Sequence, residues 1–147
     1  MPSIFPDWFG RARVIVLTQP AAGADYAVTV VPNNVIWVPD ALLGTLTTAV
    51  AAANRYPTLY LQDNASHPFI SSVQGAIVAS QVTACDWYQN ATQFLPVNNS
   101  YLFGVCGIPL VAMPEGYKIY IITVNIQAAD QWSAGALKVR EWLNPHS

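Results

Sequence analysis

The stretch PEGYKIYIITVNIQAADQW, residues 114–132, decides the fold predicted for this chain. Its central part alternates as a β-strand does, because successive side chains of a strand point to opposite sides. One side carries Lys118, Tyr120, Ile122, Val124 and Ile126, and the other carries Tyr117, Ile119 and Ile121 before it turns polar at Thr123, Asn125 and Gln127. A strand that lies over a single core needs one apolar side. The second apolar side therefore predicts a cover, which is another sheet, a long loop or another protein chain.

Alternating segments recur along the rest of the chain. They occupy residues 13–19, 25–31, 35–38, 55–63, 100–103, 108–112 and 135–143. Residues 42–50 also suit a helix, but their threonines and Gly44 favour a strand, and residues 76–90 fit one bent strand or two shorter ones. About eight to ten short strands separated by turn residues predict an all-β fold, an antiparallel β-sandwich that is jelly-roll-like, with helix confined to a turn or two.

Proline and glycine mark the expected ends of several strands. Residues 35–38 should stop at Pro39, because proline has no N–H to donate to a neighbouring strand. The glycines of GVCG, residues 104–107, predict a break between two strands. The turn MPEG, residues 113–116, has its proline second and its glycine fourth, as a type I turn does. The alternation of the last segment breaks at residues 141–142, which predicts a bulge or an exposed edge.

The length fits one domain, residues 13–147, preceded by an extended N-terminal arm, residues 1–12. Two prolines in the arm, Pro2 and Pro6, exclude a helix there. The arm also carries a cluster of apolar side chains that a free tail would have no reason to expose, namely Ile4, Phe5, Trp8 and Phe9. We expect this cluster to contact a neighbouring subunit or a larger particle. The alternative is that the arm folds back as a lid over its own sheet.

The composition indicates a protein that is not a free monomer. Hydrophobic residues make up 53% of the chain and charged residues 10%, where about 25% charged is usual for soluble domains. We therefore expect a homo-oligomer, a trimer or a dimer. The net charge is -2 and the six Lys and Arg residues are spread singly, so no nucleic-acid partner is expected. No apolar run approaches the ~20 residues that span a membrane, and the N-terminus does not match a signal peptide, which predicts use without secretion.

The sequence offers few residues for chemistry. Its two histidines, His67 and His146, are far apart along the chain, so we predict no metal site and no catalytic triad. The carboxylates are scattered, and the glycines form no phosphate-binding motif. We therefore predict no catalytic residue, no cofactor and no enzymatic activity. Cys85 and Cys106 are expected to be reduced core thiols, since nothing indicates an oxidising compartment.

Four segments resemble a known group of proteins. They are GADYAVTVV at 23–31, ANRYPTLYL at 53–61, PEGYKI at 114–119 followed by IQAADQW, and VREWL at 139–143. This pattern is similar to that of small structural proteins of tailed bacteriophages. The resemblance implies a non-enzymatic virion component of β-sandwich fold, present in many copies and assembled in the host cytoplasm. It implies a capsid decoration or cement protein that binds the major capsid protein, or else a neck, tail or head-fibre component.

The low charge of the chain and the resemblance to virion proteins together indicate candidate interface residues. They are Ile4, Phe5, Trp8 and Phe9 of the arm, Tyr117, Ile119 and Ile121 of the doubly apolar strand, and Trp142 near the C-terminus. A rival interpretation is a carbohydrate-binding β-sandwich module or a small β-sandwich enzyme. In that case Trp87, Tyr88 or Trp132 would provide the platform on which a sugar ring stacks.

Overall fold

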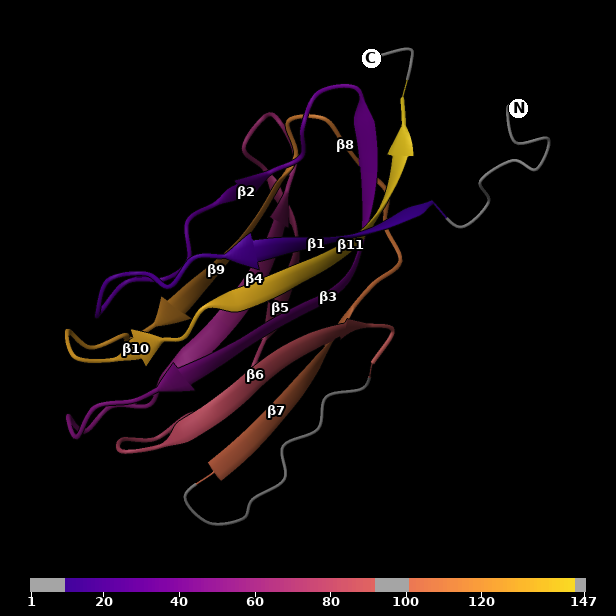
Figure 1. The fold of residues 1–147 in the computed structure, drawn as a ribbon. Coiled ribbons are helices and arrows are strands. Elements are labelled where there is room, and N and C mark those ends of the chain that lie inside the picture. The colour runs from indigo at the N-terminus through magenta and orange to yellow at the C-terminus, as the bar shows by residue number, and fades with distance from the viewer. Residues whose placement is uncertain (1–9, 92–100, 145–147) are drawn as a thin grey trace.

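The computed structural model describes residues 10–91 and 101–144, and these residues form strands and loops without a helix (Figure 1). No helix among them could therefore cross a membrane. The strands are β1 (Arg11–Leu17), β2 (Thr29–Val30), β3 (Val35–Thr47), β4 (Tyr56–Gln62), β5 (Pro68–Val73), β6 (Val82–Gln89), β7 (Tyr101–Ile108), β8 (Met113–Pro114), β9 (Lys118–Val124), β10 (Gln131–Trp132) and β11 (Gly135–Leu143). The all-β prediction is confirmed.

The strands form two sheets, which Figure 1 shows as two layers. Sheet A has the order β1-β11-β3-β6-β7, and β8 and β10 each pair with a part of β3. Sheet B has the order β2-β9-β4-β5. All pairs are antiparallel except one, because β6 and β7 run parallel with Val82 opposite Tyr101. The prediction of a purely antiparallel fold is therefore wrong for this pair. Parallel strands need a crossover connection, which alternation within each strand does not reveal.

One hydrophobic core lies between the sheets. Sheet A contributes Trp37, Leu42, Leu46, Trp87, Trp132 and Leu137, and sheet B contributes Leu59, Leu61, Ile119 and Ile121. Trp87 and Trp132 are 0% exposed. The polar residue Thr123 also lies on this side of β9, because Asp25 accepts hydrogen bonds from both its amide and its hydroxyl. These contacts show how a polar residue can follow Ile119 and Ile121 on the core side of the strand.

β3 runs through Pro39, where the sequence predicted a strand end. Pro39 is opposite Val139 and Ala41 is opposite Lys138, so Asp40 is an extra residue in β3. On its other side β3 pairs with β8 before this point and with β6 after it, which leaves Pro39 between the two ladders. The missing N–H of proline therefore breaks no ladder. Of the bulge or exposed edge predicted at residues 141–142, the bulge is wrong in position, since the extra residue is Asp40 of β3.

Two further predictions are corrected nearby. β7 continues through Gly104 and Gly107, where the sequence predicted a break. The two glycines suit the strand because Gln74 and Ala91 lie too close to them to leave room for a side chain. Residues 109–112 then form no strand. The tight turn is Pro114 to Tyr117, closed by a hydrogen bond from the Tyr117 amide to the Pro114 carbonyl. Gly116 is its third residue with φ +81°, which is the type II pattern and not type I.

Candidate functional site

The predicted interface residues fall into three groups in the structure. Ile4, Phe5, Trp8 and Phe9 lie outside the described residues. Ile119 and Ile121 are 2% and 3% exposed in the core, so they present no surface to a partner, and their assignment to an interface is corrected. Tyr117 and Trp142 are partly buried, and Trp142 packs against Gly10 at the start of β1.

The exposed side of β9 is the other one, with Lys118, Tyr120, Ile122 and Val124. Together with the outward residues of β2, β4 and β5 it forms a surface that we call the outer face of sheet B. Its outward positions are Val30, Tyr56, Thr58, Tyr60, Gln62, Pro68, Ser71, Val73, Lys118, Tyr120, Ile122 and Val124. Lys118 is the one charged residue among these described positions. A charged residue seldom faces a core, so Lys118 was the signal that could have identified the exposed side of β9.

The outer face of sheet B is apolar and ordered. Val30, Val73, Ile122 and Val124 are each 46–49% exposed, and Val28 beside them is 51% exposed. In the middle, Tyr60 and Tyr120 stack with ring centroids 5.3 Å apart at 17°. The Tyr120 hydroxyl donates a 2.8 Å hydrogen bond to Gln62, which satisfies its polar group within the chain. What remains for a partner is mostly hydrocarbon and ring surface.

A second apolar surface lies at the end of the molecule where four loops meet, at the left of Figure 1. We call it the loop end, and it comprises residues 18–28, 48–55, 74–81 and 125–130. Small apolar residues are exposed at its tips, namely Ala21, Ala22, Val50, Ala51, Ala52, Val78, Ala128 and Ala129. Val50 is 87% exposed. Turn tips usually carry polar residues, so this composition is unusual.

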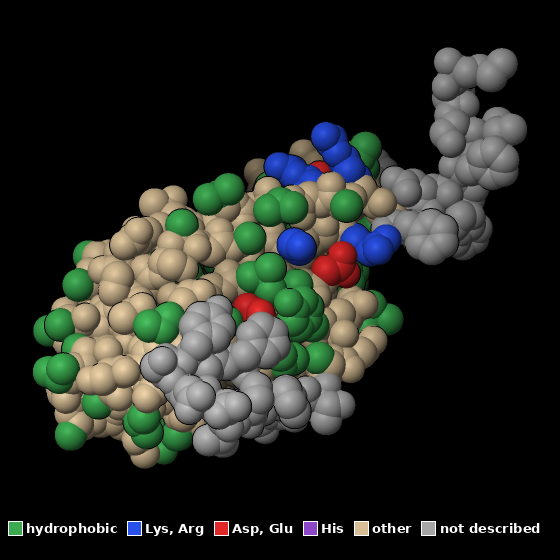
Figure 2. Space-filling view, turned by 60° about the horizontal axis from the view of Figure 1, so that its bottom comes forward, with side chains coloured by type: hydrophobic (Ala, Val, Ile, Leu, Met, Phe, Trp, Pro, Cys, Tyr) green, Lys and Arg blue, Asp and Glu red, His purple; other side chains and the backbone are tan. Residues whose placement is uncertain are grey.

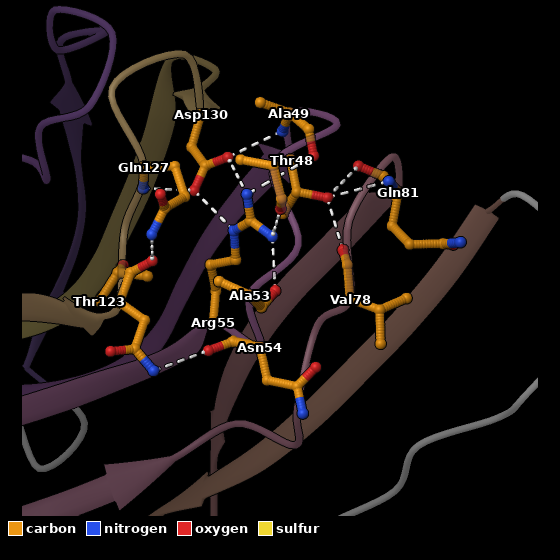
Figure 3. A network of polar contacts seen from close by, with 12 residues as sticks. Thr48, Ala49, Ala53, Asn54, Arg55, Val78, Gln81, Thr123, Gln127 and Asp130 are labelled. Atoms are coloured by element: carbon orange, nitrogen blue, oxygen red, sulfur yellow. Dashed lines mark hydrogen bonds and ion pairs between the residues drawn. The ribbon is translucent and has the colours of Figure 1, made fainter.

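A buried network holds the loop end together (Figure 3). Arg55 and Asp130 are both 0% exposed, and the guanidinium donates bonds of 2.8 and 2.9 Å to the carboxylate. Arg55 also donates to the carbonyls of Ala51 and Ala53. Asp130 accepts 2.7 Å bonds from the amides of Ala49 and Gln127. The pair therefore satisfies backbone groups of two loops at once.

The same bonds set the ionisation of Asp130. Burial alone would raise its pKa, but the bonds from Arg55 and from the Ala49 and Gln127 amides outweigh burial and lower it. A third loop joins through Thr48, whose hydroxyl donates to the Val78 carbonyl at 2.7 Å and accepts from the Gln81 amide at 2.9 Å. The loop end is thus a fixed surface, as a preorganised contact surface has to be.

Charged side chains are concentrated elsewhere, on β1 and β11. Four of the six Lys and Arg residues of the chain are there, Arg11, Arg13, Lys138 and Arg140, and we call them the basic strip. Two acidic residues lie against the strip, with Arg13 3.0 Å from Glu141 and Arg140 3.3 Å from Asp40. In Figure 2 the charged side chains of the visible face gather in one part, and the left of the view shows none.

The described residues offer little for catalysis or for sugar binding through tryptophan. They contain no group of three or more His, Cys, Asp or Glu side chains that could hold a metal ion. His67 is exposed and lies 3.4 Å from Asp63. Cys85 and Cys106 are buried free thiols, and burial raises the pKa of both. Because Trp87 and Trp132 are 0% exposed, neither can stack on a sugar ring, which leaves Tyr88 of the three predicted platforms.

Comparison with protein families, curated proteins and solved structures finds no match for this chain.

Proposed function

We propose that this chain is a non-enzymatic structural protein of a phage virion that acts in many copies, and that the outer face of sheet B packs against the same face of a second copy. The observation that carries this proposal is the exposed, nearly uncharged outer face, on a chain with 10% charged residues. The virion is proposed as the location because four segments of the sequence resemble small structural proteins of tailed bacteriophages. A capsid decoration or cement role, with the major capsid protein as the larger partner, is preferred to a neck, tail or head-fibre role.

We further propose that the fold is a jelly roll. The pairs β1–β11, β2–β9, β3–β6 and β4–β5 are nested one inside the next along the chain. The contacts of β11 with β3 and of β9 with β4 then give the orders β1-β11-β3-β6 and β2-β9-β4-β5. This nesting supports two Greek keys in two packed sheets, an architecture common in viral capsid proteins. β7 would be an addition beside β6.

The chemistry of the outer face favours a second copy as its partner. Lys118 begins β9 and therefore lies at the rim of the outer face. Two such faces can meet without like charges facing each other at the centre. Five aliphatic side chains that are each about half exposed leave roughly 400 Å² of apolar surface, a size at which a patch is often functional. Two faces would bury roughly 800 Å² in total, below the roughly 1,200–2,000 Å² of a stable complex. We therefore expect a weak pair that other contacts reinforce in an assembly.

Sedimentation velocity tests the proposed interface. The wild-type chain should show a sedimentation coefficient that rises with concentration in the micromolar range. Ile122→Lys should abolish the rise, because the interface would bury an unpaired charge, and it should leave the melting temperature nearly unchanged. Val16→Lys is the matched control, since Val16 is a 73% exposed strand residue of sheet A. A wild-type chain that stays monomeric throughout, or an equal effect of the control, contradicts the proposal.

The arm and the virion need separate tests. Deleting residues 1–10 should weaken assembly or attachment to the particle and leave the melting temperature nearly unchanged, if the arm contacts a neighbour. Normal assembly with a much lower melting temperature would indicate a lid instead. Mass spectrometry of purified virions tests the location, and comparison of isolated heads with isolated tails separates decoration of the head from a neck or tail role.

A further inference from the structure

A hollow of about 310 Å³ lies at the end of the molecule opposite the loop end. Asp63 follows β4, Phe69 belongs to β5, Tyr117 precedes β9, and Val111 and Ala112 precede β8. These five residues line the hollow, which we call the aromatic hollow. Three separate segments of the chain therefore supply one carboxylate, two aromatic rings and a small aliphatic wall.

Asp63 is a fixed negative charge at this site. Its Oδ1 atom accepts bonds from the amides of Ala65 at 2.9 Å and His67 at 2.8 Å, and its side chain is 27% exposed. The bond from the His67 amide is the main reason that the pKa of Asp63 is lowered. Its Oδ2 atom lies 3.4 Å from Nδ1 of His67, and no Lys or Arg of the described residues is within ion-pair distance. Asp63 can therefore bind a cation through Oδ2 while Oδ1 keeps its hydrogen bonds to the amides of the turn.

The two rings form a corner beside this charge. The ring centroids of Phe69 and Tyr117 are 5.8 Å apart, and the ring planes meet at 61°. Phe69 is 39% exposed, so its ring is open to a ligand. The face of an aromatic ring is negative and attracts ammonium and guanidinium groups. Val111 and Ala112 add the apolar surface against which the methylene groups of a long basic side chain can pack.

We propose that the aromatic hollow is a receptor site for a guanidinium or ammonium group on an aliphatic stem, supplied in the assembly by a basic side chain of a second copy. This occupant rests on the proposed self-association. Aromatic rings alone would accept any apolar group, and a carboxylate alone would accept any cation. Their combination with an aliphatic wall selects arginine or lysine side chains.

Charge complementarity points to a second copy. Within the basic strip, Arg13 and Arg140 are paired with Glu141 and Asp40. Arg11 and Lys138 are exposed and form no ion pair with any described residue. The chain thus presents two cations without an ion pair to a described residue on β1 and β11, and at the aromatic hollow a carboxylate without a Lys or Arg partner among the described residues. Because the basic strip belongs to sheet A, two copies would bring these groups together in a contact separate from the pairing of the outer faces of sheet B, either reciprocally across a two-fold axis or head to tail.

A titration of the full-length chain carrying Ile122→Lys tests the receptor site without interference from association. The probe is Nα-acetyl-arginine amide, followed by the NMR shifts of the Phe69 and Tyr117 ring protons. Nα-acetyl-citrulline amide is the matched control ligand, because it has the same shape without the charge. We expect saturable shifts at millimolar arginine amide and none with citrulline amide. Equal shifts with both ligands overturn the proposal.

Variants of the hollow sharpen this titration. Asp63→Asn keeps the acceptor for the Ala65 and His67 amides and removes the charge, so binding should weaken at least fivefold with the turn intact. Phe69→Leu and Tyr117→Leu should weaken binding similarly, and Tyr117→Phe should preserve it because the ring remains. Binding that is unchanged in both Asp63→Asn and Phe69→Leu contradicts the assigned site.

Charge exchange in the wild-type background tests the occupant. Asp63→Lys should weaken association about tenfold. Mixing this variant with Arg11→Glu should restore association if Arg11 supplies the cation, and mixing it with Lys138→Glu should do so if Lys138 supplies it. If neither mixture restores it, the occupant is not a second copy. If Ile122→Lys abolishes association but the arginine probe does not bind, this inference fails and the proposed function stands. Probe binding by a chain that never associates supports the receptor site and contradicts the proposed self-association.

Discussion

Two ion pairs of this molecule share the same chemistry and differ in surroundings. Arg55 and Asp130 are 0% exposed at the loop end, and Arg13 and Glu141 are 45% and 10% exposed at the edge of sheet A. The buried pair also holds the carbonyls of Ala51 and Ala53 and two loop amides. Removal of one partner of a buried pair leaves a charge and several backbone groups without partners. The difference teaches that the backbone groups a pair satisfies decide its importance more than the attraction between its charges.

Breaking the buried pair should have the largest effect. Asp130→Asn should lower the free energy of unfolding by about 3–5 kcal/mol, because Arg55 then keeps its charge in the core without a counterion. The measurement is chemical denaturation, with Asp40→Asn at the exposed ion pair with Arg140 as the control. A loss below about 1 kcal/mol would show that the loop end does not depend on the pair.

Replacing both partners sharpens the point. Hydrophobic residues can often replace a buried ion pair without loss of stability. Here Arg55→Met combined with Asp130→Leu should remain about as unstable as Asp130→Asn, since the loop carbonyls and amides lose their partners in both proteins. Recovery of more than half of the lost stability in the double variant would contradict this explanation.

The pH dependence of the buried pair has a defined sign. The pKa of Asp130 is lower in the folded chain than its ordinary value of 3.8. Its contribution to stability is therefore present above the unfolded pKa and is lost as the pH falls through the folded pKa. The difference in unfolding free energy between the wild type and Asp130→Asn should be constant from neutral pH to about pH 5 and shrink below about pH 4. A difference that does not change down to pH 2 would be inconsistent with this linkage.

At the edge of sheet A the two partners should differ. Glu141 accepts a 2.8 Å bond from the indole nitrogen of the buried Trp37 as well as the bonds from Arg13. Glu141→Ala should therefore cost about 1–3 kcal/mol, because the indole N–H loses its acceptor. Arg13→Ala should cost less than about 1 kcal/mol, since the Arg13 side chain is 45% exposed and Glu141 keeps its bond from Trp37. Thermal melts of both variants check the order, and equal losses would show that the charge pair dominates.

The smallest expected effect has the opposite sign. Asp86 is 8% exposed, forms no ion pair with a described residue, and has its pKa raised mainly by burial, against a 3.5 Å bond from Tyr88. The charged form is therefore unfavourable in the fold at neutral pH. Asp86→Asn should raise the free energy of unfolding at pH 7 by up to about 1 kcal/mol. The gain should disappear as the pH falls and Asp86 takes up its proton, and destabilisation at pH 7 would refute the argument.

Local pattern predicted most of the strands but not β5, and it could not predict the pairing between distant segments. β1 and β9 follow from alternation within a few residues. The parallel partner of β6 and the passage of β3 through Pro39 depend on neighbouring strands that no short segment encodes. Alternation separated the two sides of β9 but did not show which side is exposed. The polar Thr123 lies on the core side because it bonds to Asp25, which is 98 positions away in the chain.

The same limit applies to the candidate surfaces. The low charge predicted an apolar surface, but its position on sheet B required the sheet order. Arg55 and Asp130 are 75 positions apart, and although both lie in segments that carry the resemblance, nothing in either segment indicated that the two residues pair. Asp63, Phe69 and Tyr117 are brought together by the order β9-β4-β5. Side chains from three segments cannot be assembled into one site from spacing alone.

The pairing of β1 with β11 has a consequence for the order in which the chain can fold. Arg13 and Glu141 are 128 positions apart, so β1 emerges from the ribosome well before the strand with which it pairs. Until β11 pairs with it, β1 has no described neighbour in sheet A, so its backbone N–H and C=O groups remain open to other chains. Contacts between distant segments form slowly. Closure of β11 against β1 is therefore expected to be a late step of folding, and before it the unpaired edge of β1 can pair with other chains.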